Sequence, residues 1–210
     1  PKGFKNFKKS IGSFLDWKMD IPGYIKKNLN YKNTVSFIDH HLSHASSAFF
    51  PSPYKEAAIL TIDGVGEWTT ASISIGKDNK IKMLKELKYP HSLGLLYSAF
   101  TYYAGFKVNF GEYKLMGLAP YGEAKYVDTI KDNLIQIKED GSFQLDMTYF
   151  DFATGDKMIN DKFNSLFGGP PRKPETEIRQ KDMDIAKSIQ TVTEEIVMKL
   201  AITAKKITKA

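Results

Sequence analysis

The stretch that most constrains the fold is Ala57–Ile62, a short run that is apolar except for Thr61. It ends at a turn, residues 63–66, that contains two glycines. A short apolar run bounded by such a turn is typical of a buried strand. Thr69–Ile75 then alternates with period two, and Ile81–Leu87 follows one more turn. The sequence therefore predicts three successive strands joined by turns.

Helical spacing of apolar residues occurs on both sides of these strands. Four stretches show it: residues 4–19, 41–50, 93–104 and 185–207. Helices and strands that follow one another without repeats favour an α/β domain.

Three further segments carry weaker signals. Residues 1–33 form a basic helical segment, which we expect to pack on the remaining domain, residues 34–210. Thr34–Ile38 predicts a short strand, and Gly111–Gly122 predicts a loop followed or interrupted by a short apolar turn. The proline-rich stretch 167–174 predicts a stiff connector, in which we expect Arg172 to be exposed; the alternative is a phosphate contact.

A histidine cluster is the most specific chemical feature of the chain. His40, His41 and His44 lie within five residues, directly after the predicted strand 34–38. On a helix, His40 and His44 project from one face, one turn apart, whereas His41 points elsewhere. Such a pair can bind one metal ion, and a carboxylate from a neighbouring strand, such as Asp63, can complete the site. His41 then has a supporting or structural role.

The turn after the first predicted strand offers a second functional signal. Gly64 and Gly66 free the backbone N–H groups near Asp63 to face a ligand, an arrangement that binds phosphate oxygens. Aspartates in turns usually have a structural role, so the interpretation of Asp63 as a functional residue depends largely on the nearby histidine pair. Further along, Glu112 and Lys114 stand beside glycines; they form either a surface ion pair in a structural loop or part of an active cleft.

The overall composition limits the class of protein. The hydrophobic share of 42% and the charged share of 26% are ordinary for a soluble globular protein, and no apolar run reaches the length of a membrane span. Cysteine is absent, so a metal must be held by nitrogen and oxygen ligands, and we expect a cytoplasmic protein. The net charge of +6 comes mainly from dispersed lysines, which favours a solvated surface over a nucleic-acid site.

Five motifs in order resemble one known family. They are DHHLSHASSAFFPSPYKEAAILTIDGVGEWTTASI from residue 39, SLGLLYSAFTYYAGF from 92, GEYKLMGLAPYG from 111, FGGPPRKPE from 167 and DIAKSIQTVTEEIV from 184. Together they are similar to the carbamoyltransferases of nodulation-factor and antibiotic biosynthesis. The resemblance implies an actin-like, sugar-kinase-like ATPase fold, of which this chain holds the end of the first lobe and most of the second.

The resemblance also implies a reaction. A separate adenylate-forming domain converts ATP and carbamoyl phosphate to carbamoyladenylate, and the actin-like domain transfers the carbamoyl group to a hydroxyl of a small metabolite or sugar. His40, His44 and Asp63 match the family's ligands for a divalent metal, with Fe²⁺ expected. Gly64, Val65, Gly66 and Glu67 match its phosphate-holding loop, and Lys114 is a further candidate cofactor-binding residue.

Some elements of the family pattern have no match in these residues. The phosphate hairpin of the first lobe, a GGxALN-like adenosine element, a further aspartate ligand and the adenylate-forming domain are expected in a longer enzyme, of which this chain is a central part. Two alternatives stay open. One is an enzyme that forms threonylcarbamoyladenosine in tRNA, although its usual Ser-Gly-Gly phosphate loop differs from residues 63–67. The other is a non-enzymatic basic nucleic-acid-binding module with structural histidines.

Overall fold

A three-stranded antiparallel sheet forms the middle layer of the computed structural model, which describes residues 2–154 and 157–210. Its strands are β1 (Glu56–Ile62), β2 (Thr69–Lys77) and β3 (Lys80–Lys88), in the order β1-β2-β3. β2 and β3 are joined by a two-residue turn in which Asp78 has a φ of 52°, a left-handed conformation that aspartate tolerates. The three strands predicted from sequence are confirmed.

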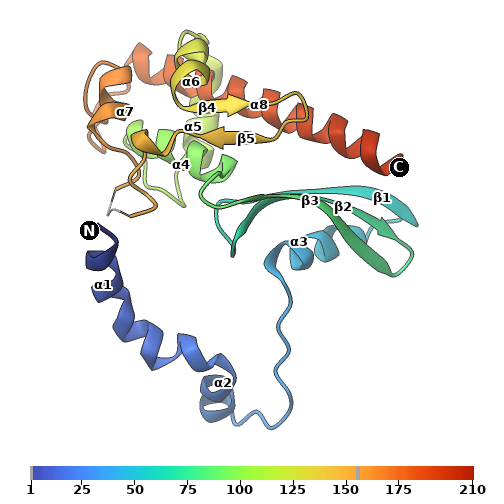
Figure 1. Cartoon of the computed structure of the whole chain (residues 1–210). Helices are drawn as coiled ribbons and strands as arrows, with labels where there is room; N and C mark the ends of the chain where they lie inside the picture. The colour runs from blue at the N-terminus through green and yellow to red at the C-terminus, as the bar shows by residue number, and fades with distance from the viewer. Residues whose placement is uncertain (1, 155–156) are drawn as a thin grey trace.

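The two faces of the sheet are covered by different helices (Figure 1). α3 (His40–Phe49) packs on one face, where its Ala45 and Phe49 contact Ile59 of β1. α8 (Gln180–Thr208) contacts β1 and β2 and belongs to the main core, which includes Ile73 from the sheet. Because side chains alternate across a strand, β1 supplies apolar residues to both layers. This explains why its sequence shows an apolar run rather than alternation.

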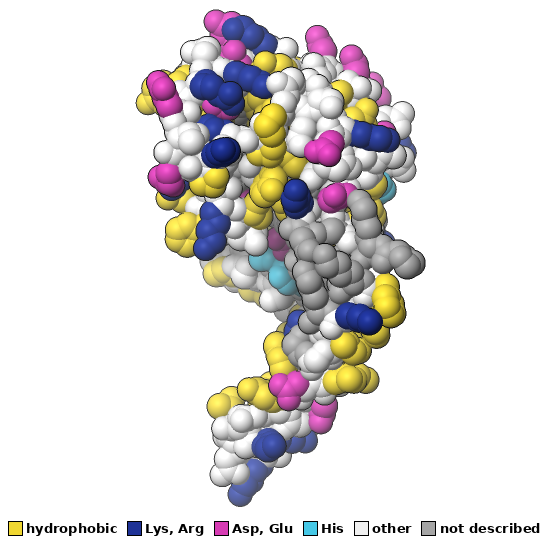
Figure 2. Space-filling view, turned by 90° about the vertical axis from the view of Figure 1, so that its left-hand side faces the viewer, with side chains coloured by type: hydrophobic (Ala, Val, Ile, Leu, Met, Phe, Trp, Pro, Cys, Tyr) yellow, Lys and Arg dark blue, Asp and Glu magenta, His cyan; other side chains and the backbone are white. Residues whose placement is uncertain are grey.

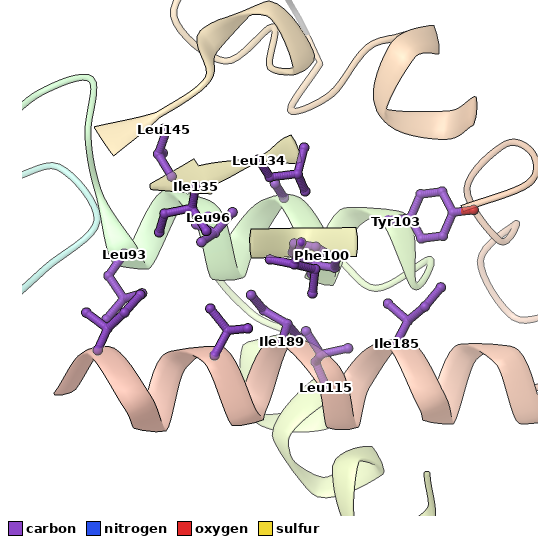
Figure 3. Close-up of a cluster of buried hydrophobic side chains, with 14 of the residues drawn as sticks. Leu93, Leu96, Phe100, Tyr103, Leu115, Leu134, Ile135, Leu145, Ile185 and Ile189 are labelled. Atoms are coloured by element: carbon purple, nitrogen blue, oxygen red, sulfur yellow. The ribbon is translucent and has the colours of Figure 1, made fainter. Parts of the chain in front are cut away.

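The main core lies between α8 and a group of shorter elements (Figure 3). The elements around it are α4 (Leu93–Tyr103), α5 (Glu112–Leu118), α6 (Val127–Asn133), α7 (Asp161–Leu166), the strands β4 (Ile135–Ile137) and β5 (Phe143–Leu145), and the short 3₁₀ helices η2 (Ala119–Tyr121) and η3 (Met147–Tyr149). α8 buries one stripe, which includes Ile185, Ile189 and Ile196, against Leu96 and Phe100 of α4. The predicted α/β class is confirmed as a mixed α/β fold with antiparallel sheets.

The amino-terminal segment differs from its prediction. α1 (Lys2–Asp16), η1 (Lys18–Asp20) and α2 (Ile21–Leu29) lie apart from the main body, and an extended stretch connects them to α3 (Figure 1). Phe4, Phe7 and Leu15 are exposed by 56%, 57% and 64%, so the expectation that this segment packs on the domain is wrong here. Hydrophobic side chains accordingly gather on the narrow lower part of the molecule in Figure 2.

Two local predictions are also corrected. Residues 34–38 form no strand in the described structure, because no neighbouring strand pairs with them and Phe37 and Ile38 are exposed by 66% each. The predicted loop Gly111–Gly122 contains α5 and η2, whose Leu115 and Leu118 are buried in the core. Among the described residues, no helix is long and apolar enough to cross a membrane.

Candidate metal centre

The histidine pair and Asp63 meet where α3 begins and β1 ends. His40 and His44 lie one turn apart on α3, and Asp63 is the first residue after β1, on which α3 packs. His40 Nε2 lies 2.6 Å from Asp63 Oδ2 and 2.9 Å from His44 Nε2, and His44 Nε2 lies 3.6 Å from Asp63 Oδ2. The structure thus brings together the three residues that the sequence proposed as metal ligands.

The geometry of this cluster fits a divalent ion. One ligand atom from each of the three side chains lies within 4.8 Å of the others. Atoms bound at about 2.1 Å to one ion lie roughly 3 Å apart, so a small adjustment of the side chains is enough. The side chains of His40 and His44 are 37% and 52% exposed, so solvent can reach the cluster. Two imidazoles and one carboxylate are a common ligand set for iron and zinc.

Asp63 is held in its charged form. Burial raises the pKa of its carboxyl, but a hydrogen bond from the Gly64 amide and the neighbouring His40 and His44 together lower it below the ordinary value. The Gly64 N–H donates to Asp63 Oδ1 at 2.6 Å, which leaves Oδ2 for the histidines. A carboxylate oriented in this way is ready to bind a cation.

His41 points away from the cluster and into the sheet. It is 2% exposed, and its Nδ1 lies 2.7 Å from Thr61 Oγ1 and 3.1 Å from Ser72 Oγ. Burial lowers the pKa of its imidazole below the ordinary value. Asp63 raises this pKa, whereas His40 and His44 lower it further. His41 therefore anchors α3 to β1 and β2, in agreement with the supporting or structural role predicted for it.

The loop after Asp63 has two kinds of backbone N–H group. The Gly64 N–H donates a hydrogen bond to the Asp63 carboxylate. The N–H groups of Val65, Gly66 and Glu67 donate to no described residue. A Cβ on Gly66 would lie 2.0–2.3 Å from atoms of the His40 ring, but a Cβ on Gly64 would meet nothing within 4 Å. A glycine at position 66 therefore lets the loop pass directly over the His40 ring.

The start of α4 fixes this loop from the other side. The Ser92 hydroxyl is buried and lies 2.6 Å from Gly64 O and 3.1 Å from Asp63 O, and it accepts a hydrogen bond from the Leu95 amide as the helix N-cap. A Cβ on Gly94 would lie 2.8 Å from backbone atoms of residues 63 and 64. Ser92 and Gly94 were not among the sequence candidates, although both belong to the SLG motif; a serine directly before an apolar helix was the available signal.

We expect the Ser92→Ala variant to lower the free energy of unfolding by about 1–2 kcal/mol, because it removes an N-cap and leaves loop carbonyls without their donor. Urea titration followed by circular dichroism measures this change. The matched control is Ser165→Ala, in which an exposed serine of α7 loses only a bond to the Asp161 carbonyl; it should change stability by less than about 0.5 kcal/mol. Equal effects of the two substitutions would contradict the assignment.

Glu112 lines the cavity beside Asp63, but Lys114 does not. Glu112 accepts hydrogen bonds from Ser98 Oγ and the Asn109 amide at 2.7 and 2.9 Å, and it lines a cavity of about 760 Å³ together with Asp63 and Gly64. Burial raises the pKa of its carboxyl, but these bonds more than compensate, so the net pKa is lowered. Lys114 lines a different cavity of about 640 Å³ and makes no ion pair with Glu112 in the described structure.

The expectation of an exposed Arg172 is wrong. Its side chain is 8% exposed, donates from Nε to Ala104 O at 2.8 Å and from Nη1 to Thr176 O at 2.6 Å, and lies over the Phe106 ring at 5.1 Å. Arg172 thus fastens the connector 167–174 to the end of α4. The acceptors of Nε and Nη1 are mainly backbone carbonyls, so these two nitrogens hold the connector in place.

Comparison with known proteins places this chain in a family. A model of the carbamoyltransferase N-terminus matches residues 4–210. An uncharacterized protein of Synechocystis sp. is 53% identical over 208 residues, which are 95% of this chain and 34% of that protein. The nodulation protein NolNO of Sinorhizobium fredii is 31% identical over 193 residues, 87% of this chain and 26% of that protein.

A third relative covers less of the chain. The nodulation protein NolO of Bradyrhizobium diazoefficiens is 32% identical over 108 residues, 51% of this chain and 20% of that protein. The chain therefore spans about a third or less of the length of the relatives it matches. The resemblance found in the five sequence motifs is confirmed: the chain belongs to the carbamoyltransferase family and corresponds to its N-terminal region.

Proposed function

We propose that this chain is the metal-binding part of an O-carbamoyltransferase. The observation that carries the proposal is the cluster of His40, His44 and Asp63, whose ligand atoms lie within 4.8 Å of one another beside a cavity of about 760 Å³. We propose Fe²⁺ as the metal, in line with the family resemblance. When bound, the ion supplies Lewis-acid polarisation of a carbamoyl carbonyl or orients a phosphate.

The donor proposed for this site is carbamoyladenylate, formed from ATP and carbamoyl phosphate. The N–H groups of Val65, Gly66 and Glu67 have no described acceptor and are available to an anionic oxygen. Gly64 contributes indirectly, because its N–H orients Asp63. Lys114 lies on another cavity, and we assign it no part in holding this phosphate.

The wider organisation of the enzyme is also a proposal. A sheet between helical layers is compatible with part of an actin-like ATPase fold, with residues 1–33 as a separate basic helical segment and 34–210 as the domain itself. Formation of the adenylate is assigned to another domain. A cytoplasmic location stays a prediction from composition. The tRNA-modifying and nucleic-acid-binding alternatives rest on the charge of +6.

Metal analysis of the purified protein tests the site. We expect about one equivalent of divalent metal in the wild-type protein, and a loss of at least tenfold in metal affinity in His40→Ala and Asp63→Ala, because each removes one of three ligands. Asp39→Asn is the matched control. Asp39 is exposed, directly precedes His40 and makes no side-chain capping bond, so this variant should keep its metal.

Two readouts separate the outcomes. Inductively coupled plasma mass spectrometry measures bound metal, and circular dichroism shows that each variant is folded. Unchanged metal content in both ligand variants would reject the metal site. Salt-sensitive RNA binding that survives the loss of both histidines would favour the nucleic-acid alternative.

A further inference from the structure

The net charge of the protein is concentrated in its amino-terminal segment, residues 1–33. This segment contains eight lysines, two aspartates and no arginine, so its charge at pH 7 is +6. Lysines also occur throughout residues 34–210, but there 22 basic residues are balanced by 22 acidic ones. The whole net charge of the chain therefore lies in a segment that Figure 1 shows apart from the main body.

The helix α1 combines this charge with an apolar face. Its apolar residues recur at spacings of one, three and four, which place them on one side of a helix. They are Phe4, Phe7, Ile11, Phe14 and Leu15. The phenylalanines and the leucine are exposed, and the isoleucine is partly buried. An apolar helical face in a stretch with four lysines is typical of helices that lie in the surface of a membrane.

Two aromatic residues extend this apolar surface from α1 to α2. The ring centroids of Trp17 and Tyr24 lie 6.0 Å apart, and both side chains are exposed. Lys18 Nζ lies 5.6 Å from the centroid of the Trp17 ring. Tryptophan and tyrosine are enriched where lipid meets water, because each has an apolar ring and a polar group that stays hydrated. A lysine stem lies along such a surface while its ammonium group reaches the lipid phosphates.

The charge distribution distinguishes a membrane from other partners. A second copy of the segment would bring +6 against +6, and this repulsion opposes self-association. An RNA neutralises lysines, but Ile11 and Leu15 offer no ring on which a base can stack, and the segment lacks the arginine that nucleic-acid sites favour. An anionic lipid surface offers headgroups to the lysines and hydrocarbon to the apolar face.

We propose that residues 1–33 bind the surface of an anionic membrane. The apolar face of α1 enters the lipid, and the lysines of the segment lie at the headgroups. The ten residues between Leu29 and His40 span at most about 40 Å, so binding holds the metal cluster close to the membrane. The inference goes beyond the proposed carbamoyl transfer and does not depend on it.

Cosedimentation of the whole protein with vesicles tests the proposal. We expect binding to a three-to-one mixture of phosphatidylcholine and phosphatidylglycerol, and much weaker binding at high salt or to phosphatidylcholine alone. Lys26→Glu/Lys27→Glu should lower the partition coefficient at least tenfold. Lys205→Glu/Lys206→Glu is the matched control, because it also replaces two adjacent lysines in the last turn of a helix; it should bind like the wild-type protein.

Tryptophan emission tests whether the apolar face enters the lipid. The chain contains two tryptophans, so in the Trp68→Phe protein the emission reports Trp17 alone. We expect a blue shift with the mixed vesicles. Phe7→Ser in this background should weaken binding about five- to tenfold, because it removes apolar area. Phe110→Ser, at an equally exposed phenylalanine of the main body, should bind like its parent.

Four results would overturn the proposal. The first is no binding of the wild-type protein to the mixed vesicles, and the second is an equal loss of binding in the two lysine variants. The third is a dimer without lipid that Phe7→Ser converts to a monomer, because a second copy then covers the apolar face. The fourth is a shift of the Trp17 emission with polyuridylate but not with vesicles, which would assign the segment to RNA. In each case the metal content, measured separately, still tests the proposed function.

Discussion

Replacing Gly66 with alanine should lower metal affinity roughly 10- to 100-fold while the protein stays folded. The added Cβ would lie 2.0–2.3 Å from three atoms of the His40 ring, well inside any real contact. The imidazole can rotate away from the loop at little cost, because it is 37% exposed. When His40 is rotated, its Nε2 no longer lies beside Asp63. The cluster then has one ligand atom out of position, although all three side chains are still present.

Gly64→Ala is the matched control for this prediction. A Cβ at this position meets nothing within 4 Å, and Gly64 has no positive φ. Isothermal titration with Fe²⁺ under anaerobic conditions compares the two variants, and urea unfolding checks that both are equally stable. If the two alanine variants bind metal equally well, the loop does not pass over His40 as the structure has it.

The Phe100→Ala variant should lose about 3–5 kcal/mol of unfolding free energy, the range for truncating a fully buried phenylalanine. Phe100 is 0% exposed, and its ring lies 5.2 Å from that of Phe163 and 5.4 Å from that of Phe167. These partners come from α7 and the connector that follows it, so the side chain joins α4 to distant parts of the chain. Removing it leaves a cavity that rigid neighbours cannot fill.

Phe37→Ala provides the comparison for this loss. Phe37 is 66% exposed in the stretch between α2 and α3, so its truncation should change stability by less than about 0.5 kcal/mol. Chemical denaturation of both variants, monitored by circular dichroism, gives the two free energies. A loss below about 1 kcal/mol for Phe100→Ala would show that α4 and α7 do not share one core.

The elements that were predicted correctly depend on local patterns. The β1, β2 and β3 strands are bounded by turn residues, and α4 and α8 repeat apolar residues at intervals of three and four. Such signals act over a few residues and need no partner to be recognised. The same holds for His40 and His44, whose spacing alone puts both imidazoles on one helical face.

The errors arose where distant contacts decide the structure. Residues 34–38 have strand propensity, but no neighbouring strand accepts their hydrogen bonds. The glycines of 111–122 suggested a loop, yet burial of Leu115 against α8 stabilises α5 there. Arg172 was expected at the surface because arginine usually is, whereas its Nε and Nη1 donate to the carbonyls of Ala104 and Thr176 inside the fold.

By itself, the sequence determined the strands β1 to β3, the helices α4 and α8, the family and the three candidate metal ligands, because each is encoded in a short pattern or an ordered set of motifs. Only the tertiary structure decided that Asp63 reaches His40, that Gly66 lies against the imidazole, and that Ser92 holds the loop from α4. The physical reason is that these contacts join residues 23 to 29 positions apart and depend on how α3 and α4 pack beside the sheet.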